Sequence, residues 1–303
     1  MNDDLPIAPA PPPMFTRPKA LLPAGACDGH VHMVSDGTDF ALWSGRVETP
    51  APGDFDTWYA RFSATQDRLG LGRTIFVHSI LFGADNSVTL AAVRRMGRAQ
   101  ARAVVLVPDG TREQKLQEFR DQGASAVRLN YVHGGILSWQ GAVQMAPDLA
   151  AQGMHIQMLL NTDAHMGQIA DDIRALPVPV VIDHLGWPNV AQGLDEPGFQ
   201  TLLALMGEGH VYVKLSAPYR YDAAPFSMSL KMMRALLDAN AERCLWGSDW
   251  PHLMLGPAAM PDTGQMLNTL IDVATPAELD QVLVTNPETL YGFDPAERRA
   301  AQS

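Results

Sequence analysis

Cysteines and long apolar runs are both scarce in this sequence. Its 303 residues include only two cysteines, Cys27 and Cys244, so a disulfide framework is not expected. No apolar run reaches the roughly 18 residues that a membrane-spanning helix needs. The opening segment, MNDDLPIAPAPPPMF, is acidic where a signal peptide would be basic. We therefore expect a cytoplasmic protein without a membrane span.

Basic residues are also few. The chain has 22 Lys and Arg against 33 Asp and Glu, which gives a formal net charge of −11. This balance argues against nucleic acid or an anionic membrane surface as the partner. It leaves a small anionic substrate open, because a local pair of arginines can override the global sign. Homo-oligomerisation is likewise left open by the composition.

What the chain does contain is a regular alternation of two patterns. Short runs rich in β-branched residues predict eight strands, at 24–33, 73–80, 102–107, 125–131, 154–161, 178–184, 210–216 and 243–249. Between them, helical spacing of apolar residues predicts helices at 54–70, 86–100, 111–123, 141–152, 163–175, 195–207, 226–240 and 262–274. Asn86 is the predicted N-cap of the second helix.

Eight strands that alternate with helices predict a single (β/α)8 barrel of the TIM type. A doubly wound open sheet would normally carry a glycine-rich phosphate turn after its first strand, and here that turn holds DGHVH. We divide the chain into an extended, Pro-rich N-terminal arm over 1–23, a barrel over 24–295 and a C-terminal tail over 296–303.

Reactive residues of such barrels lie at the C-terminal ends of the strands. His30 and His32 end the first predicted strand at a spacing of two, which places both rings on one face, toward the barrel interior. Two inward histidines suit a metal, or a site that polarises a carbonyl. His184 and Asp249 end the sixth and eighth strands and join them as candidate catalytic residues.

Asp249 lies between an apolar strand and an aromatic turn, in LWGSDWPH. Because an unpaired buried carboxylate is costly, it must be paired or functional, and we interpret it as the general base for an attacking water. The alternative is an aspartate that caps the turn. Asp183, which directly precedes His184, is expected to point out of the barrel and to be structural. His155 begins a strand and is expected near the bottom of the barrel.

Arginines near a barrel mouth are suited to hold a carboxylate in a bidentate fork, although each could equally tie a loop. The candidate substrate-binding residues are Arg128, Arg220, His78, Ser79, Tyr219 and His252.

Five segments together resemble the amidohydrolase superfamily in its lactonase branch: CDGHVH, AVRLNY, VVIDHLGWP, LWGSDWPH and VTNPETLYGF. The resemblance runs from about residue 22 to residue 293 and implies a somewhat distorted barrel and lactone hydrolysis in the breakdown of aromatic compounds. It implies that Asp249 activates water, beside His30, His32 and His184. It also implies that Arg128 and Arg220 bind substrate carboxylates.

The chain departs from the family in two respects. Metal-binding members carry a lysine or glutamate after strand 4 and a histidine after strand 5, where this sequence has Arg128 and the segment Gln157–Asn161. No metal is therefore expected to be obligatory, although His30, His32, His184 and Asp249 could hold one divalent ion such as zinc. Trp187 replaces an arginine of the two-carboxylate clamp, so the substrate could be a pyrone dicarboxylate, a muconolactone or a sugar-acid lactone.

Three other functions remain open on the sequence. A metal-dependent non-oxidative decarboxylase of the same superfamily would use the same histidines and Asp249 as metal ligands. A catalytically silent barrel could bind an anionic metabolite, although the intact histidines and Asp249 speak against it. A lactone isomerase is the third, and the related isomerases lack the aspartate of strand 8.

Overall fold

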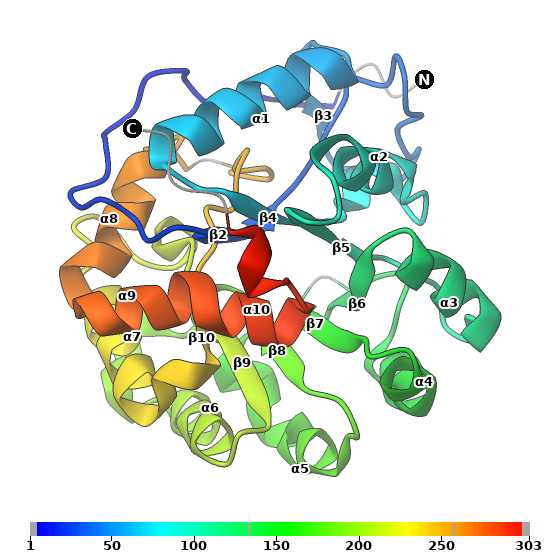
Figure 1. The fold of residues 1–303 in the computed structure, drawn as a ribbon. Helices are drawn as coiled ribbons and strands as arrows, with labels where there is room; N and C mark the ends of the chain where they lie inside the picture. Colours follow the sequence, from blue (N-terminus) through cyan, green and yellow to red (C-terminus); the bar gives the residue numbers. More distant parts are fainter. Residues whose placement is uncertain (1–4, 133, 257, 299–303) are drawn as a thin grey trace.

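The computed structural model describes residues 5–132, 134–256 and 258–298. Its main feature is an eight-stranded parallel sheet curled into a barrel, with helices around it (Figure 1). The strands are, in sheet order, β2 (Cys27–Val31), β4 (Arg73–Val77), β5 (Ala101–Val105), β6 (Ala124–Asn130), β7 (His155–Leu159), β8 (Val180–Ile182), β9 (Val211–Lys214) and β10 (Cys244–Leu245). The predicted (β/α)8 barrel is confirmed.

The helices are α1 (Phe55–Leu69), α2 (Ser87–Met96), α3 (Glu113–Asp121), α4 (Trp139–Ala151), α5 (Gly167–Ala175), α6 (Pro197–Gly207), α7 (Ser227–Asn240), α8 (Thr263–Val273), α9 (Pro276–Asp280) and α10 (Asn286–Tyr291). The first eight match the predicted helices within a few residues. None of the described helices combines the length and apolar character that a membrane crossing needs.

The cap of α2 differs in detail from the prediction. Asn86 does precede the helix, but its side chain makes no capping bond to it. Instead it accepts a hydrogen bond from Leu106 N at 2.8 Å and donates to Leu106 O at 2.8 Å. Asn86 therefore ties the start of α2 to the segment that leaves β5, a role that helix periodicity does not reveal.

The barrel closes between β2 and β10, which meet less regularly than the other neighbours. Gly29 N donates to Trp246 O at 2.9 Å, Asp249 N to His30 O at 2.9 Å and His32 N to Trp250 O at 2.8 Å. Gly29 is needed here because a Cβ at this position would lie 2.5 Å from Trp246 O. The closure matters for function because it brings the histidines of β2 beside the segment that follows β10.

Apolar side chains fill the barrel interior toward the N-terminal ends of the strands and separate its two ends. They form a buried cluster of Cys27, Ile75, Val77, Val104, Ala126, Val181, Tyr212, Leu245, Tyr291 and Phe293. Tyr291 and Phe293 come from the end of α10 and the turn after it, which lie across the N-terminal ends of the strands (Figure 1). The chemistry is thereby confined to the opposite end.

The described part of the N-terminal arm packs on the barrel. Its strand β1 (Ile7–Ala8) pairs in parallel with β3 (Thr49–Pro50), and Phe15 is buried. Thr16 N and Oγ1 both donate to Asp262 Oδ2, the N-cap of α8, at 3.0 and 2.9 Å. The ends of the predicted arm and tail, 1–4 and 299–303, lie outside the described residues.

Candidate active site

Three imidazoles converge on one carboxylate oxygen at the C-terminal end of the barrel. Asp249 Oδ1 lies 3.7 Å from His30 Nε2, 3.6 Å from His32 Nε2 and 3.7 Å from His184 Nε2. All four side chains are buried, and Oδ1 itself has no hydrogen-bond partner. The four residues predicted to be catalytic are thus brought together around a gap that a small polar molecule could fill.

The other oxygen of Asp249 is firmly held. Tyr219 OH donates to Oδ2 at 2.6 Å. Arg220 Nε donates to the same oxygen at 2.8 Å, and Arg220 NH2 lies 2.6 Å from it. Tyr219 OH also lies 3.1 Å from His252 Nδ1, whose Nε2 lies 2.9 Å from Thr263 Oγ1. This arrangement fixes the carboxylate in place and leaves Oδ1 as its only open acceptor.

The backbone that carries these side chains adopts left-handed conformations that non-glycine residues seldom occupy. All eight described non-glycine residues with positive φ lie in the segments that follow β8, β9 or β10: His184, Leu185, Trp187, Ala217, Phe226, Asp249, His252 and Met254. Asp249 has a φ of 62° and His184 one of 53°. Such conformations cost about 1–3 kcal/mol each and cluster at functional sites. Here they turn the chain sharply enough to aim consecutive side chains inward.

The prediction for the direction of the Asp183 side chain was wrong. The side chain was expected to point out of the barrel, but it is fully buried inside, with Oδ1 at 3.2 Å from both His30 Nδ1 and Lys214 Nζ. Gln157 Nε2 donates to its other oxygen at 3.1 Å. The alternation of strand side chains fails here because β8 already ends at Ile182.

Lys214 and Gln157 are site residues that the sequence analysis did not select. Both are fully buried in strands, β9 and β7. The signal was available: a lysine in the apolar run VYVKLS and a glutamine in HIQML each require a buried partner.

The hydrogen bonds define the tautomers of the β2 histidines. Val77 O can only accept, so His32 Nδ1, at 2.8 Å from it, carries the proton and His32 Nε2 presents a lone pair. Lys214 Nζ, at 3.1 Å, meets hydrogen-bond geometry to His30 Nδ1, whereas Asp183 Oδ1 does not. His30 therefore carries its proton on Nε2, which lies 3.3 Å from the His32 Nε2 lone pair. Lys214 thus points the His30 N–H into the site.

His184 presents a lone pair to the same gap. Its Nδ1 lies 2.8 Å from Ser216 Oγ, which can accept a proton from it, and Asp249 Oδ1 takes no hydrogen bond from Nε2, so we assign the proton to Nδ1. His184 Nε2 and the ionised Asp249 Oδ1 then face each other at 3.7 Å without a hydrogen between them. Two acceptors so placed require a bridging donor such as water, or a cation.

Burial and the neighbouring charges keep these groups in defined protonation states. Burial lowers the pKa of His184 to about 4, and it lowers that of His30 well below its usual value with help from Lys214. Burial lowers the pKa of Lys214 to about 8, against the opposing effect of Asp183. Burial alone would raise the pKa of Asp249, but the Arg220 guanidinium beside it holds that pKa well below the usual range. At neutral pH the site therefore combines neutral imidazoles with an ionised carboxylate.

The two predicted carboxylate-binding arginines differ in how they are engaged. Arg220 is occupied by Asp249 and, through NH2 at 2.9 Å, by Leu253 O. Arg128 donates to His78 O at 2.7 Å, its Nε has no partner, and it forms no ion pair with any described carboxylate. Arg128 is therefore the cation left available to an anionic ligand.

His78 and Ser79 lie close by but are engaged by the fold. His78 Nδ1 lies 3.0 Å from Thr89 Oγ1 and its Nε2 lies 2.8 Å from Gly83 O. Ser79 Oγ accepts from Leu81 N at 3.3 Å and caps a short 3-10 turn, Ile80–Phe82. The carbonyl of His78 contacts the site, because it accepts a hydrogen bond from Arg128 and orients it, whereas the ring of His78 does not.

The ligand atoms of His30, His184 and Asp249 all lie within 4.8 Å of one another, which is compatible with a single metal ion. A ligating imidazole nitrogen must be free of its proton. Metal binding at His30 Nε2 would therefore place the proton of this ring on Nδ1, where Asp183 Oδ1 lies 3.2 Å away as an acceptor.

Two cavities flank this site without containing it. One, of about 300 Å³, lies beside the mouth and is lined by Asn161, Trp187, Asn189 and Tyr221. The other, of about 500 Å³, lies at the far end of the barrel, where His155 lines it at the start of β7, as predicted for that histidine.

Comparison with known proteins points to one family. The amidohydrolase family profile matches residues 27–293. The chain is 32% identical over 296 residues to a 2-pyrone-4,6-dicarboxylate hydrolase of Comamonas testosteroni, which spans 91% of this chain and 93% of that protein. It is 31% identical over 290 residues to a 4-sulfomuconolactone hydrolase of Hydrogenophaga intermedia, covering 90% of each. A D-galactarolactone isomerase of Agrobacterium fabrum is 27% identical over 93% of this chain and 96% of that one.

Solved structures show the same architecture. A Pseudomonas putida protein, solved as a candidate 2-pyrone-4,6-dicarboxylic acid hydrolase, matches with a TM-score of 0.73 and 25% identity over 90% of this chain and 99% of that chain. An amidohydrolase from Burkholderia multivorans with bound zinc has a TM-score of 0.64 and 17% identity over 89% of this chain and all of that chain. At that identity, the second likeness shows the fold alone.

Proposed function

The chain belongs to the amidohydrolase family, and from this premise we propose that it is a hydrolase that opens a small lactone bearing a carboxylate. The observation that carries the proposal is Asp249 Oδ1, a buried carboxylate oxygen without a hydrogen-bond partner that faces three neutral imidazoles at 3.6–3.7 Å. The two hydrolases named above act on lactones, in agreement with this chemistry.

Substrate binding is assigned to the free cation of the mouth. A carboxylate of the lactone would accept from Arg128, whose Nε lacks a partner. Because Arg220 is occupied by Asp249, one carboxylate is enough to satisfy the site. This supports a lactone with a single essential anionic group, such as a carboxylated muconolactone or a sugar-acid lactone, besides a pyrone dicarboxylate.

The hydrolytic step follows from the proton positions. A water molecule in the gap donates one hydrogen to Asp249 Oδ1 and the other to the His184 Nε2 lone pair. Its oxygen attacks the lactone carbonyl carbon while Asp249 takes one proton. As the ring C–O bond breaks, Asp249 returns that proton to the leaving oxygen, which becomes a hydroxyl group or its keto tautomer. The second proton of the water stays on the new carboxylic acid, which releases it to solvent and becomes a carboxylate.

Stabilisation of the developing oxyanion is assigned to His30. Its Nε2–H, oriented by Lys214, is the hydrogen-bond donor that the β2 pair presents to the site. Asp249 is so well stabilised by Arg220 that it is a weak base. Most of the rate acceleration must therefore come from positioning and from the oxyanion contact, each of which typically lowers a barrier by several kcal/mol.

The proposal is tested by a panel of lactones with and without carboxylates, assayed by acid release near neutral pH. We expect turnover of carboxylated lactones and much slower turnover of neutral lactones of the same ring size. Failure to open any carboxylated lactone, with decarboxylation or isomerisation observed instead, would overturn it.

A metal-dependent decarboxylase is the second candidate, favoured by the spacing of His30, His184 and Asp249. The two are separated by exhaustive chelation. Because Arg128 and Gln157 occupy positions where metal-binding members of the family carry ligands, we expect lactonase activity to survive chelation. Complete loss that zinc restores would favour the metal-dependent reaction.

A further inference from the structure

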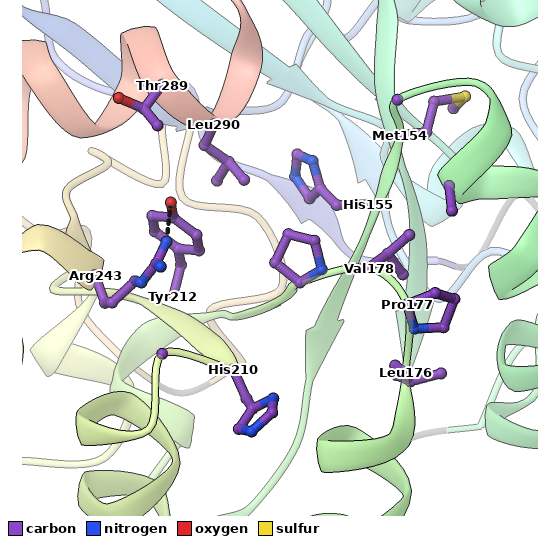
Figure 2. Close-up of a pocket in the computed structure, with 14 residues that line it drawn as sticks. Met154, His155, Leu176, Pro177, Val178, His210, Tyr212, Arg243, Thr289 and Leu290 are labelled. Carbon is purple, nitrogen blue, oxygen red and sulfur yellow. Dashed lines mark hydrogen bonds between the residues drawn. The ribbon is translucent and has the colours of Figure 1, made fainter.

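The end of the barrel opposite the active site contains a cavity of about 500 Å³ (Figure 2). It lies between the start of β7, the segments that lead into β8 and β9, and α10. In Figure 2, His155, His210 and the pair Arg243 and Tyr212 surround the same space, with Leu290 above and Val178 at the side. Its volume falls within the range of about 300–1,000 Å³ that is typical of small-molecule sites.

The polar lining of the cavity is basic. Arg243 provides a cation, the imidazoles of His155 and His210 also line the cavity, and no Asp or Glu is among its described lining residues. The carboxylate nearest to the ring of His210 is Glu208, at 3.9 Å, and it is bound by Arg174 at 2.8 and 3.1 Å. In a chain with a net charge of −11, an acid-free cavity with a basic lining favours an anionic ligand.

Arg243 is the strongest anchor for an anion. Its NH1 donates to Tyr212 OH, and its guanidinium carbon lies 4.7 Å from the centroid of the Tyr212 ring. It forms no ion pair with a carboxylate of the described residues. A guanidinium held by an aromatic ring and left without a counter-ion can bind a carboxylate through two parallel hydrogen bonds.

The remaining wall is suited to an apolar body with a polar group at its far end. Leu176, Pro177, Val178, Pro179 and Leu290 provide the apolar surface. His155 is 2% exposed, and its Nε2 has no hydrogen-bond partner. A buried polar nitrogen of this kind destabilises the fold unless it is satisfied, and a ligand group can satisfy it.

We propose that this cavity is a second binding site, which takes a small organic carboxylate with a cyclic apolar body. The carboxylate pairs with Arg243, the ring packs on Pro177 and Val178, and a polar substituent reaches His155. The site is separate from the active site and does not depend on the lactonase proposal. Two strands nevertheless connect the two sites. Gln157 follows His155 by two residues on β7, and Lys214 follows Tyr212 by two residues on β9.

The first test measures binding of 4-fluorobenzoate by fluorine NMR. We expect Arg243→Met to weaken its binding by at least about tenfold, the effect of losing a charge-assisted pair, and Arg243→Lys to retain part of it. Arg128→Met, which removes the cation of the active-site mouth, should leave this binding unchanged. Equal binding to wild type and Arg243→Met, or loss of all binding in Arg128→Met, would overturn the proposal.

The second test uses the wild-type protein, so it does not depend on how a variant folds. Crystals soaked in 4-bromobenzoate would show the bromine by anomalous scattering. We expect a peak between Val178 and Leu290, with the carboxylate on Arg243. Bromine found only at the C-terminal mouth, or nowhere, would contradict the second site.

Discussion

The two ends of this barrel both bury arginines, but they leave them in different states. At the N-terminal end, Arg102 donates through Nε to Tyr291 O at 3.0 Å, through NH1 to Ala101 O at 2.9 Å and through NH2 to Gly292 O at 2.6 Å. At the C-terminal end, Arg128 has an Nε without a partner. Arg102 thus serves the fold with all three nitrogens, whereas Arg128 retains a donor for a ligand.

Two buried carboxylates, one at each end of the barrel, differ in the same way as the two arginines. Glu288, at the N-terminal end, accepts from Arg73 at 2.5 Å and from Arg298 at 2.7 Å on each of its oxygens. Asp249, at the C-terminal end, has one oxygen held by Tyr219 and Arg220 and the other unbonded. Burial of a charge therefore does not by itself mark a functional site, and neither does an unfilled bond, because Arg73 Nε at the N-terminal end also lacks a partner. Asp249 Oδ1 differs because it faces three imidazoles at 3.6–3.7 Å.

The largest effect is expected from Asp249→Asn. The amide keeps size and polarity but cannot take the proton of water, so kcat should fall by about 10²–10⁴-fold, with the fold intact by thermal unfolding. Asp222→Asn is the matched control, because Asp222 accepts from Ser229 N at 3.0 Å on the same side of the barrel and asparagine caps equally well. Near-normal turnover by Asp249→Asn would refute the mechanism.

At the opposite end, Arg73→Met should reduce stability and spare catalysis. Arg73 is fully buried and pairs with Glu288, so we expect a loss of about 3 kcal/mol in the free energy of unfolding. This is the low end for a buried pair, because Arg298 still neutralises Glu288. The exposed Arg95, paired with Asp56, is the control, and Arg95→Met should cost less than about 1 kcal/mol. Denaturant titration measures both, and an equal loss in kcat/KM for Arg73→Met would break the contrast between the ends.

The two arginines of the mouth should separate binding from chemistry. Arg128→Met should lower kcat/KM by about thirtyfold for a carboxylated lactone, equivalent to about 2 kcal/mol, and much less for a neutral one. Arg220→Met should lower both, because it releases Asp249 Oδ2. If Arg128→Met impaired charged and neutral lactones equally, the anionic-substrate assignment would fail while the role of Asp249 could still stand.

The pH dependence of stability links the two ends of the barrel. Burial lowers the pKa of His155 to about 3 and that of His184 to about 4, whereas each takes a proton near pH 6.5 in the unfolded chain. Their neutral forms therefore stabilise the fold above pH 6.5, and this contribution is lost as the pH falls below it. Each histidine should add about 1.4 kcal/mol per pH unit to the slope of unfolding free energy between roughly pH 4 and 6.5.

Glutamine at either position should reduce that slope by a similar amount, as measured by denaturant titration at several pH values. Only His184→Gln should reduce turnover, since His155 lies away from Asp249. A slope that neither substitution changes would show that these histidines are not buried in the neutral form.

The sequence predicted the architecture and the four residues that the structure brings together around Asp249 Oδ1. The alternation of strand and helix patterns predicted the barrel, and the rule that reactive groups follow strand ends selected His30, His32, His184 and Asp249. Both inferences depend on local periodicity, because side chains alternate between the two faces of a strand and their direction can therefore be predicted from the sequence. The prediction that His155 lies at the far end of the barrel rested on the same logic.

The contacts that hold and orient those groups depend on the folded barrel and could not be predicted from the sequence. Asp183 points inward because the strand ends at Ile182 and His184 adopts a φ of 53°, which no strand period encodes. Lys214 sets the His30 tautomer across 184 positions of sequence, and Arg220 binds Asp249 instead of standing free. Proton positions and unfilled hydrogen bonds arise from distances between segments far apart in the chain, so they became visible only when the barrel closed between β2 and β10.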